Sequence, residues 1–172
     1  DVTACGHLDD LVVRYLTQPT SGFLKSIAAF TESVTIRQPC LVMHVRRTDN
    51  LLNDGWDHAR KLYRWDPLSR YVEAANEFPA ATTLLLTDDS AVLEETRSFS
   101  RDWQWLDRPR HRGTSGGWEN HFPSGNRTSE MAAILALRQL ASKCTAFIGS
   151  RSSFGRFIFL GMRGATKKLV AT

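Results

Sequence analysis

Short apolar runs alternate with segments of helical spacing along most of this chain. The run Cys40–Val45 is almost wholly apolar and is bounded by polar residues, which is typical of a buried strand in a parallel sheet. Similar runs at 82–86 and 145–148 predict two further strands, and residues 103–106 predict a shorter one. The expected sheet therefore has four strands.

Apolar residues spaced three and four apart predict helices between and before these strands. The expected helices cover residues 8–16, 23–30, 67–78, 91–97, 128–140 and 154–162. Asp66 is expected to cap the third helix, with Pro67 at its first position, and Thr128 is expected to cap the fifth. The expected apolar face of that fifth helix consists of Met131, Ile134, Leu135, Leu137 and Leu140.

Alternating strands and helices define the expected fold class. Such a chain forms right-handed crossovers and an open parallel sheet of the α/β class. The length of 172 residues fits one domain or a fragment of a larger protein. Ligands of open parallel sheets bind outside the carboxyl ends of the strands, so the residues that follow each strand are the first candidates for a site.

Three of the expected strands end in polar clusters. The first strand runs into His44–Asp49, the second into Thr87–Ser90 and the fourth into Gly149–Ser153. The carboxyl ends of parallel strands lie on one edge of the sheet, so these clusters are expected to converge there.

The residue types in these clusters suit a phosphorylated ligand. The paired guanidinium groups of Arg46 and Arg47 can neutralise a diphosphate, one on each phosphate. Hydroxyl and backbone N–H groups at the start of the last helix add an anion site. The carboxylates of Asp88 and Asp89 can hold the arginines in place or accept hydrogen bonds from sugar hydroxyls.

Each cluster also has a purely structural interpretation. An arginine pair after a strand is often only solvated charge, and Asp88–Asp89 and Ser152–Ser153 are both typical helix caps. His44 lies on an apolar strand, where a buried core histidine is common. The convergence of the clusters on one edge favours the site over these separate explanations.

Composition narrows the choice of ligand only a little. The chain has seventeen Arg and five Lys residues and a net charge of +4, a bias toward the side chain that binds phosphate in a planar fork. No GxGxxG sequence and no Walker loop is present, which argues against a nicotinamide enzyme or a P-loop NTPase. No spacing of histidines or carboxylates suggests a dedicated metal site.

The sequence leaves the compartment open. No apolar run approaches the ~20 residues that cross a membrane, and the first residues do not resemble a signal peptide. The three cysteines do not form a disulfide framework, and Cys40 and Cys144 are expected to be buried thiols. Asn126–Thr128 is an N-glycosylation sequon, which fits the secretory pathway but is also common by chance.

The segment His44–Asp49, with the sequence HVRRTD, resembles the donor-binding domain of the α-1,6-fucosyltransferases. The similarity extends over roughly residues 10–162 in the family's order. Its other elements are Tyr15–Leu16, Pro19, Leu24, Asp66–Pro67 through Tyr71, Leu86–Asp89, and Ser152–Ser153 followed by Arg156.

This resemblance implies a GDP-fucose-dependent glycosyltransferase that inverts the anomeric configuration and needs no divalent metal. It implies the GT-B architecture of two Rossmann-like halves, with residues 1–172 as the C-terminal, donor-binding half and 1–33 as a helical lead-in. The implied partners are a nucleotide-sugar donor and a glycan acceptor, with no nucleic acid. The implied location is the Golgi or secretory lumen, with a membrane anchor only outside this chain.

The resemblance also implies roles for individual residues. Arg46 and Arg47 would grip the β-phosphate and stabilise the departing GDP, and His44 would contact guanine. Asp54 stands where the family has a glutamate proposed as the general base. The remaining implied donor-site residues are Asp49, Tyr71, Asp88, Asp89, Ser152, Ser153 and Arg156.

The sequence departs from the family pattern in ways that keep two other functions open. Asn50 replaces a lysine, and Ala136 lies near the position of an aspartate that reads guanine. A degenerate homologue that binds the donor without turnover is therefore one alternative. A basic polyanion-binding or nucleic-acid-binding module is another, built on Arg108–Arg112 with Trp103, Trp105 and Trp118 nearby.

Overall fold

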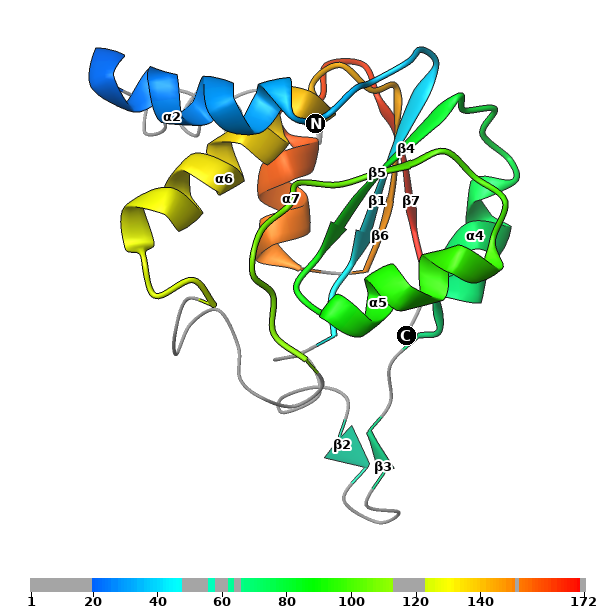
Figure 1. The fold of residues 1–172 in the computed structure, drawn as a ribbon. Coiled ribbons are helices and arrows are strands. Elements are labelled where there is room, and N and C mark those ends of the chain that lie inside the picture. The colour runs from blue at the N-terminus through cyan, green and yellow to red at the C-terminus, as the bar shows by residue number, and fades with distance from the viewer. Residues whose placement is uncertain are drawn as a thin grey trace, which may run out of the picture.

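The computed structural model describes residues 20–47, 56–57, 62–63, 66–112, 123–150 and 152–170. Its centre is a five-stranded sheet in the order β5-β4-β1-β6-β7, in which every pair of neighbours is parallel (Figure 1). The strands are β1 (Cys40–Val45), β4 (Thr82–Thr87), β5 (Trp103–Gln104), β6 (Ala146–Gly149) and β7 (Thr166–Leu169). A separate antiparallel pair consists of β2 (Trp56–Asp57) and β3 (Leu62–Tyr63).

Helices cover both faces of the sheet (Figure 1). One face carries α2 (Ser21–Glu32), α6 (Arg127–Ala141) and α7 (Ser153–Phe159). The other carries α4 (Leu68–Ala75) and α5 (Ser90–Glu95), the latter continued by a 3-10 turn at Thr96–Ser98. Within the described ranges, no helix combines the length and the apolar character needed to cross a bilayer.

The central strand β1 explains why its sequence is apolar throughout. Strands β4 and β6 pair with its two edges, and all six of its residues are buried. Successive side chains of a strand point to opposite faces, so Val42 packs against the α6 side while Leu41 and Met43 pack against α4. A strand covered on both faces has no position for an exposed polar side chain, which produces a continuous apolar run.

The direction in which the chain adds strands to the sheet reverses between β1 and β6. From β1 the chain passes through β4 to β5 at one edge, and it then returns to form β6 and β7 on the other side of β1. The connecting helices of the two halves lie on opposite faces, so the carboxyl ends of β1 and β6 form a topological switch point, the place where open α/β sheets have their ligand-binding crevice.

The structure confirms the predicted open parallel sheet of Rossmann-like type. The four predicted strands are present, but the fifth, β7, was missed because its sequence Thr-Lys-Lys-Leu has no apolar run. Charged side chains are tolerated there because β7 is an edge strand whose residues are mostly exposed. The predicted helix over 8–16 lies outside the described residues.

Three details of the predicted helices are wrong. Helix α6 begins earlier than expected, with Asn126 rather than Thr128 as its cap, because the Asn126 Oδ1 atom accepts a hydrogen bond from the Ser129 backbone N–H at 3.0 Å. Met131, expected in the apolar face, is 45% exposed. Pro67 rather than Asp66 occupies the cap position of α4.

Buried alanines fill the face that larger residues were expected to form in α6. Ala132, Ala133 and Ala136 are almost fully buried, and α2 packs closely against this helix. Small side chains permit that close packing. Leu137 and Leu140 are buried as predicted, so the predicted face is right in part and lacks the alanines.

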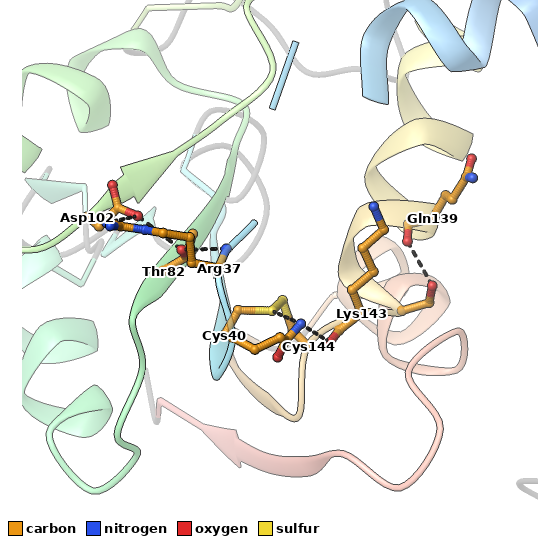
Figure 2. Close-up of a disulfide and its surroundings, with 9 residues drawn as sticks. Arg37, Cys40, Thr82, Asp102, Gln139, Lys143 and Cys144 are labelled. Atoms are coloured by element: carbon orange, nitrogen blue, oxygen red, sulfur yellow. Dashed lines mark hydrogen bonds and ion pairs between the residues drawn. A yellow bond between two sulfur atoms is a disulfide. The ribbon is translucent and has the colours of Figure 1, made fainter. Parts of the chain in front are cut away.

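A disulfide bond joins Cys40 to Cys144, so the prediction of two free buried thiols is wrong (Figure 2). Cys40 begins β1, and Cys144 precedes the neighbouring parallel strand β6, so their Cα atoms lie 4.7 Å apart although 104 positions separate them in sequence. The Thr145 backbone N–H also donates to the Cys40 carbonyl at 3.1 Å. The spacing in sequence carries no sign of this proximity, which depends on the pairing of β1 with β6.

Polar contacts surround the disulfide at the amino ends of the strands (Figure 2). The Gln38 side-chain N–H donates to the Lys143 carbonyl at 2.7 Å, on the β6 side. On the β4 side, Arg37 pairs with Asp102 at 3.0 Å, and Asp102 accepts a further hydrogen bond from Thr82 at 3.0 Å. These contacts tie the start of β1 to both of its neighbours at the end of the sheet opposite the crevice.

Removal of the disulfide is expected to destabilise the fold substantially. A bond that closes a loop of about 100 residues restricts the unfolded chain, and its loss typically costs about 2–5 kcal/mol. We expect a Cys40→Ala/Cys144→Ala double variant to show that loss in urea unfolding and to be insensitive to reductant. The Cys5→Ala variant is the control and should keep the sensitivity to reductant; equal unfolding midpoints for reduced and oxidised wild type would contradict the prediction.

Candidate functional site

His44 lies beside the crevice, on the next-to-last position of β1. Its carbonyl accepts a hydrogen bond from the Ser150 N–H at 3.3 Å, which joins the ends of β1 and β6. Its imidazole is buried between the rings of Phe147 and Phe154, with centroids 6.4 and 5.5 Å away. The first and third polar clusters therefore meet at this histidine.

The His44 imidazole is neutral at physiological pH. Burial lowers its pKa to about 4, with the positive charge of Arg46 acting in the same direction and the negative charge of Asp88 opposing it. Its Nδ1 atom is buried without a hydrogen-bond partner. A Cβ atom at Gly155 would lie 2.9 Å from this Nδ1, so only glycine allows α7 to approach the histidine so closely.

The two neighbouring arginines are placed differently. Arg46 is half-buried, and its charge acts on His44, which faces the α7 side of the sheet. Arg47 is buried and extends to the opposite side, where its guanidinium contacts Glu95 of α5. The two guanidinium groups therefore have different surroundings, and the binding of both to one diphosphate stays a prediction.

Glu95 holds Arg47 through a bidentate ion pair. The two guanidinium NH2 groups donate to Oε1 at 2.5 Å and to Oε2 at 2.9 Å, and the Arg47 side chain is only 3% exposed. Oε2 also accepts from the Leu68 N–H at 3.4 Å, at the start of α4. The hydrogen bonds from Arg47 lower the pKa of Glu95 despite its partial burial. One carboxylate thus joins the end of β1 to α4 and α5.

Asp88 connects the second polar cluster to the first. Its Oδ1 atom accepts a hydrogen bond from the Arg47 backbone N–H at 2.9 Å, which fixes the end of β1 to the end of β4. Burial lowers the pKa values of His44 and Arg108, and the negative charge of Asp88 partly opposes that lowering in both. Asp88 therefore joins the ends of β1 and β4, and its role beside a ligand stays a prediction.

Asp89 and Ser152 serve as helix caps. Asp89 is buried and accepts from the Ala91 N–H at 3.0 Å at the start of α5, and Ser152 accepts from the Gly155 N–H at 2.8 Å at the start of α7. Ser153 and Arg156 follow on α7 and are exposed. Asp89 and Ser152 thus cap helices, as their purely structural interpretation predicted. A capping side chain can also lie beside a ligand.

Tyr71 lies on the face of the sheet away from His44. It is 2% exposed within the apolar cluster between α4 and the sheet, and burial raises the pKa of its hydroxyl. The neighbouring charges that act on it include Asp66 and Arg47. Asp66 itself pairs with Arg70 one helical turn further on.

The basic segment Arg108–Arg112 is not a uniformly exposed charged surface. The Arg108 side chain is 9% exposed and pairs at 3.0 Å with Glu130, which is 2% exposed. The Arg110 guanidinium donates to the Leu106 and Arg108 carbonyls at 2.6 and 2.9 Å, and burial lowers its pKa to about 10. The polyanion-binding alternative rested on three arginines. Two of them, Arg108 and Arg110, therefore bind groups of the protein itself and hold this segment in place.

Several predicted positions lie outside the described residues, namely Asp49, Asn50 and Asp54. Their roles stay predictions. Ala136 is fully buried in α6, so the position nearest the family's guanine-reading aspartate carries a core side chain. Within the described residues no group of three or more metal-ligating side chains converges, and metal independence likewise stays a prediction.

Sequence analysis missed two carboxylates that organise the site, Glu95 and Glu130. Glu95 stands next to Glu94 on a short helix, where two carboxylates usually indicate solvated charge. Glu130 lies in the first turn of α6, where a carboxylate usually interacts only with the helix dipole. Neither sequence position shows that an arginine distant along the chain folds back onto it.

The fold and its strand-end residues together define an α/β domain of Rossmann-like type, with charged residues at the topological switch point between β1 and β6. No protein-family model matches the chain, and no curated protein matches its sequence.

Several solved structures are similar to the chain. The crystal structure of NodZ α-1,6-fucosyltransferase soaked with GDP-fucose has a TM-score of 0.48 and 19% identity, covering 84% of this chain and 43% of that chain. Fucosyltransferase NodZ from Bradyrhizobium has values of 0.47 and 18%, covering 83% and 42%. The apo-form of POFUT1 has values of 0.46 and 10%, covering 89% and 47%. This chain spans less than half the length of each of these structures.

Loss of the Glu95 carboxylate charge is expected to destabilise the fold. The Glu95→Gln variant leaves the Arg47 guanidinium buried beside a neutral partner, which we expect to lower the free energy of unfolding by about 3 kcal/mol. Urea unfolding measures the change. Glu94→Gln is the matched control, because Glu94 pairs with Arg112 at an exposed site and should change stability by less than ~0.5 kcal/mol. Equal effects of the two variants would contradict the prediction.

His44 is expected to make stability depend on pH between about 4 and 6.5. The unfolded chain protonates this imidazole near pH 6.5 and the folded chain only near pH 4, so acidification through this range favours unfolding by up to roughly 3 kcal/mol. We expect the His44→Gln variant to lose that part of the pH dependence. Unfolding midpoints measured across the range test this, and parallel curves for wild type and variant would refute it.

Proposed function

We propose that the chain is the donor-binding half of a GT-B fucosyltransferase that transfers L-fucose from GDP-fucose to a sugar hydroxyl of a glycan. One observation carries the proposal: the residues that resemble the family motif at 44–47 and Asp88 lie together at the topological switch point. The proposal takes residues 1–172 as one donor-binding domain, with 1–33 as its lead-in.

Arg46 is the proposed ligand of the donor β-phosphate. It follows β1 on the side of the crevice, and Arg47 is already committed to Glu95. A cation fixed beside the diphosphate stabilises the charge that develops on GDP as the bond to fucose breaks. In this scheme Arg47 positions the end of β1 through its ion pair with Glu95. Because both NH2 groups of the Arg47 guanidinium donate to that carboxylate, Arg47 does not compete with Arg46 for the phosphate.

The other site residues follow from the same placement of the donor. The neutral His44 imidazole is the proposed contact to guanine through its Nε2 atom, because Nδ1 is buried against Gly155. Asp88 and Asp89 line the pocket, with Ser152, Ser153 and Arg156 on the α7 side, and Tyr71 and Asp49 complete the proposed contacts. Asp54 is the proposed general base, which takes the proton of the acceptor hydroxyl as that oxygen attacks C1 of fucose with inversion.

The proposed reaction needs no divalent metal, because arginine charge takes the place of a cation at the diphosphate. The proposed compartment is the Golgi or secretory lumen. The buried Cys40–Cys144 disulfide supports an oxidising compartment, since such bonds are rare in the cytosol.

The test is calorimetric titration of the chain with GDP and GDP-fucose in the presence of EDTA. We expect binding at micromolar to sub-millimolar concentration and a loss of affinity of at least ~10-fold for Arg46→Ala, the cost of one charge-assisted hydrogen bond. Arg37→Ala is the control, because Arg37 is exposed and pairs with Asp102 at the opposite end of the sheet. It should leave donor binding unchanged.

The outcomes separate the rival functions. No binding of GDP by wild type would refute the proposal. Donor binding without transfer or hydrolysis by the full-length protein would identify a degenerate homologue. Salt-sensitive binding of an oligonucleotide that survives Arg46→Ala and is weakened by Arg112→Ala would instead support a polyanion-binding module.

A further inference from the structure

The sequon Asn126–Thr128 lies on the surface at the start of α6, with Asn126 as the cap and Arg127 and Thr128 as the first two residues of the helix. All three of its residues are exposed, as are Ser124 and Gly125 ahead of them. Gly125 has a φ angle of +68°, the left-handed conformation that favours glycine and turns the chain sharply outward before the helix. The sequon is the only Asn-x-Ser/Thr sequence in the chain.

The two ends of the Asn126 side-chain amide have separate environments. Its Oδ1 atom is the acceptor of the α6 cap, bound by the Ser129 N–H at 3.0 Å. Its Nδ2 atom makes no hydrogen bond to any residue that the structure describes. A substituent on Nδ2 therefore leaves the cap intact, and it meets solvent rather than the core.

The disulfide supplies an independent argument about the compartment. Cys40 and Cys144 are both almost fully buried and are bonded to each other, which requires folding under oxidising conditions. In eukaryotic cells the compartment that forms such bonds also contains the enzyme that glycosylates asparagine. The sequon and the disulfide thus both indicate that the chain passes through an oxidising compartment in which asparagine is glycosylated.

We propose that Asn126 carries an N-linked glycan. The Nδ2 atom forms a bond to the anomeric C1 of an oligosaccharide held on a polyprenyl diphosphate. The bond between C1 and the diphosphate oxygen breaks, the polyprenyl diphosphate leaves with the electron pair, and one amide proton passes to solvent. No oxidant or reductant takes part. The proposal does not depend on the transferase activity proposed above.

The glycan stands at the crevice end of the molecule. Helix α6 runs back toward the start of β6, so its first turn lies near the carboxyl ends of the strands (Figure 1). In that turn Glu130 accepts from the Ser124 N–H at 3.2 Å and pairs with Arg108. Three residues of chain thus separate the attachment point, Asn126, from Glu130, whose side chain is held by Arg108.

The test is expression of the chain behind a cleavable signal peptide in a eukaryotic cell, followed by peptide mass spectrometry. Treatment with a glycan-removing amidase in heavy-oxygen water converts a glycosylated asparagine to labelled aspartate. We expect that label at position 126 in molecules that also contain the Cys40–Cys144 bond. The bond shows that those molecules entered the oxidising lumen.

Two variants separate loss of the glycan from loss of the fold. Asn126→Asp keeps a good helix cap but has no amide nitrogen, so it should lose the mass shift and keep the unfolding midpoint. Thr128→Ser keeps the sequon and should keep the label. An unlabelled Asn126 in wild-type molecules that contain the disulfide would overturn the proposal, as would a mass shift that survives Asn126→Asp.

Discussion

The arrangement of the whole domain depends on the pairing of β1 along both of its edges. Six residues of β1 pair with β4, and four of them also pair with β6. This pairing places a run of apolar residues in the middle of the sheet, brings the two cysteines together at one end and brings His44, Asp88 and Ser150 together at the other. A shift of one residue in the register would exchange the faces of the sheet and separate all of these groups.

The arginines at the carboxyl end of the sheet differ in their contacts, and two of them form structural ion pairs. Arg47, with Glu95, is used to lock β1 to α4 and α5, and Arg108, with Glu130, is used to lock the segment after β5 to α6. Both pairs have at least one buried partner, so their arginines act as structural ties. Such ties hold the strand ends and helix starts in fixed positions, which is the condition for a preorganised binding site. His44 and Arg46 lie at the end of β1 that the Arg47–Glu95 pair holds.

The sequence predicted the layers of the fold well because buried strands leave an apolar signature. It failed for β7, whose lysines are acceptable only because that strand is an edge, and for the cap and part of the buried face of α6, whose small buried residues have no strong periodic signal. At the site, the convergence of three strand ends followed from the parallel topology alone. The ion pair of Glu95, the disulfide and the inward turn of Arg108 did not, because each joins residues distant in sequence whose proximity exists only once the sheet has formed.

The disulfide also changes the connectivity of the molecule. It closes residues 40–144 into a covalent ring that contains β1, β4, β5 and α6, while β6 and β7 leave the ring from the same bond that fixes the start of β1. A single cut of the backbone anywhere inside this ring therefore leaves one covalent molecule. The strands on both sides of the crevice stay attached to each other through sulfur, and only reduction releases two fragments.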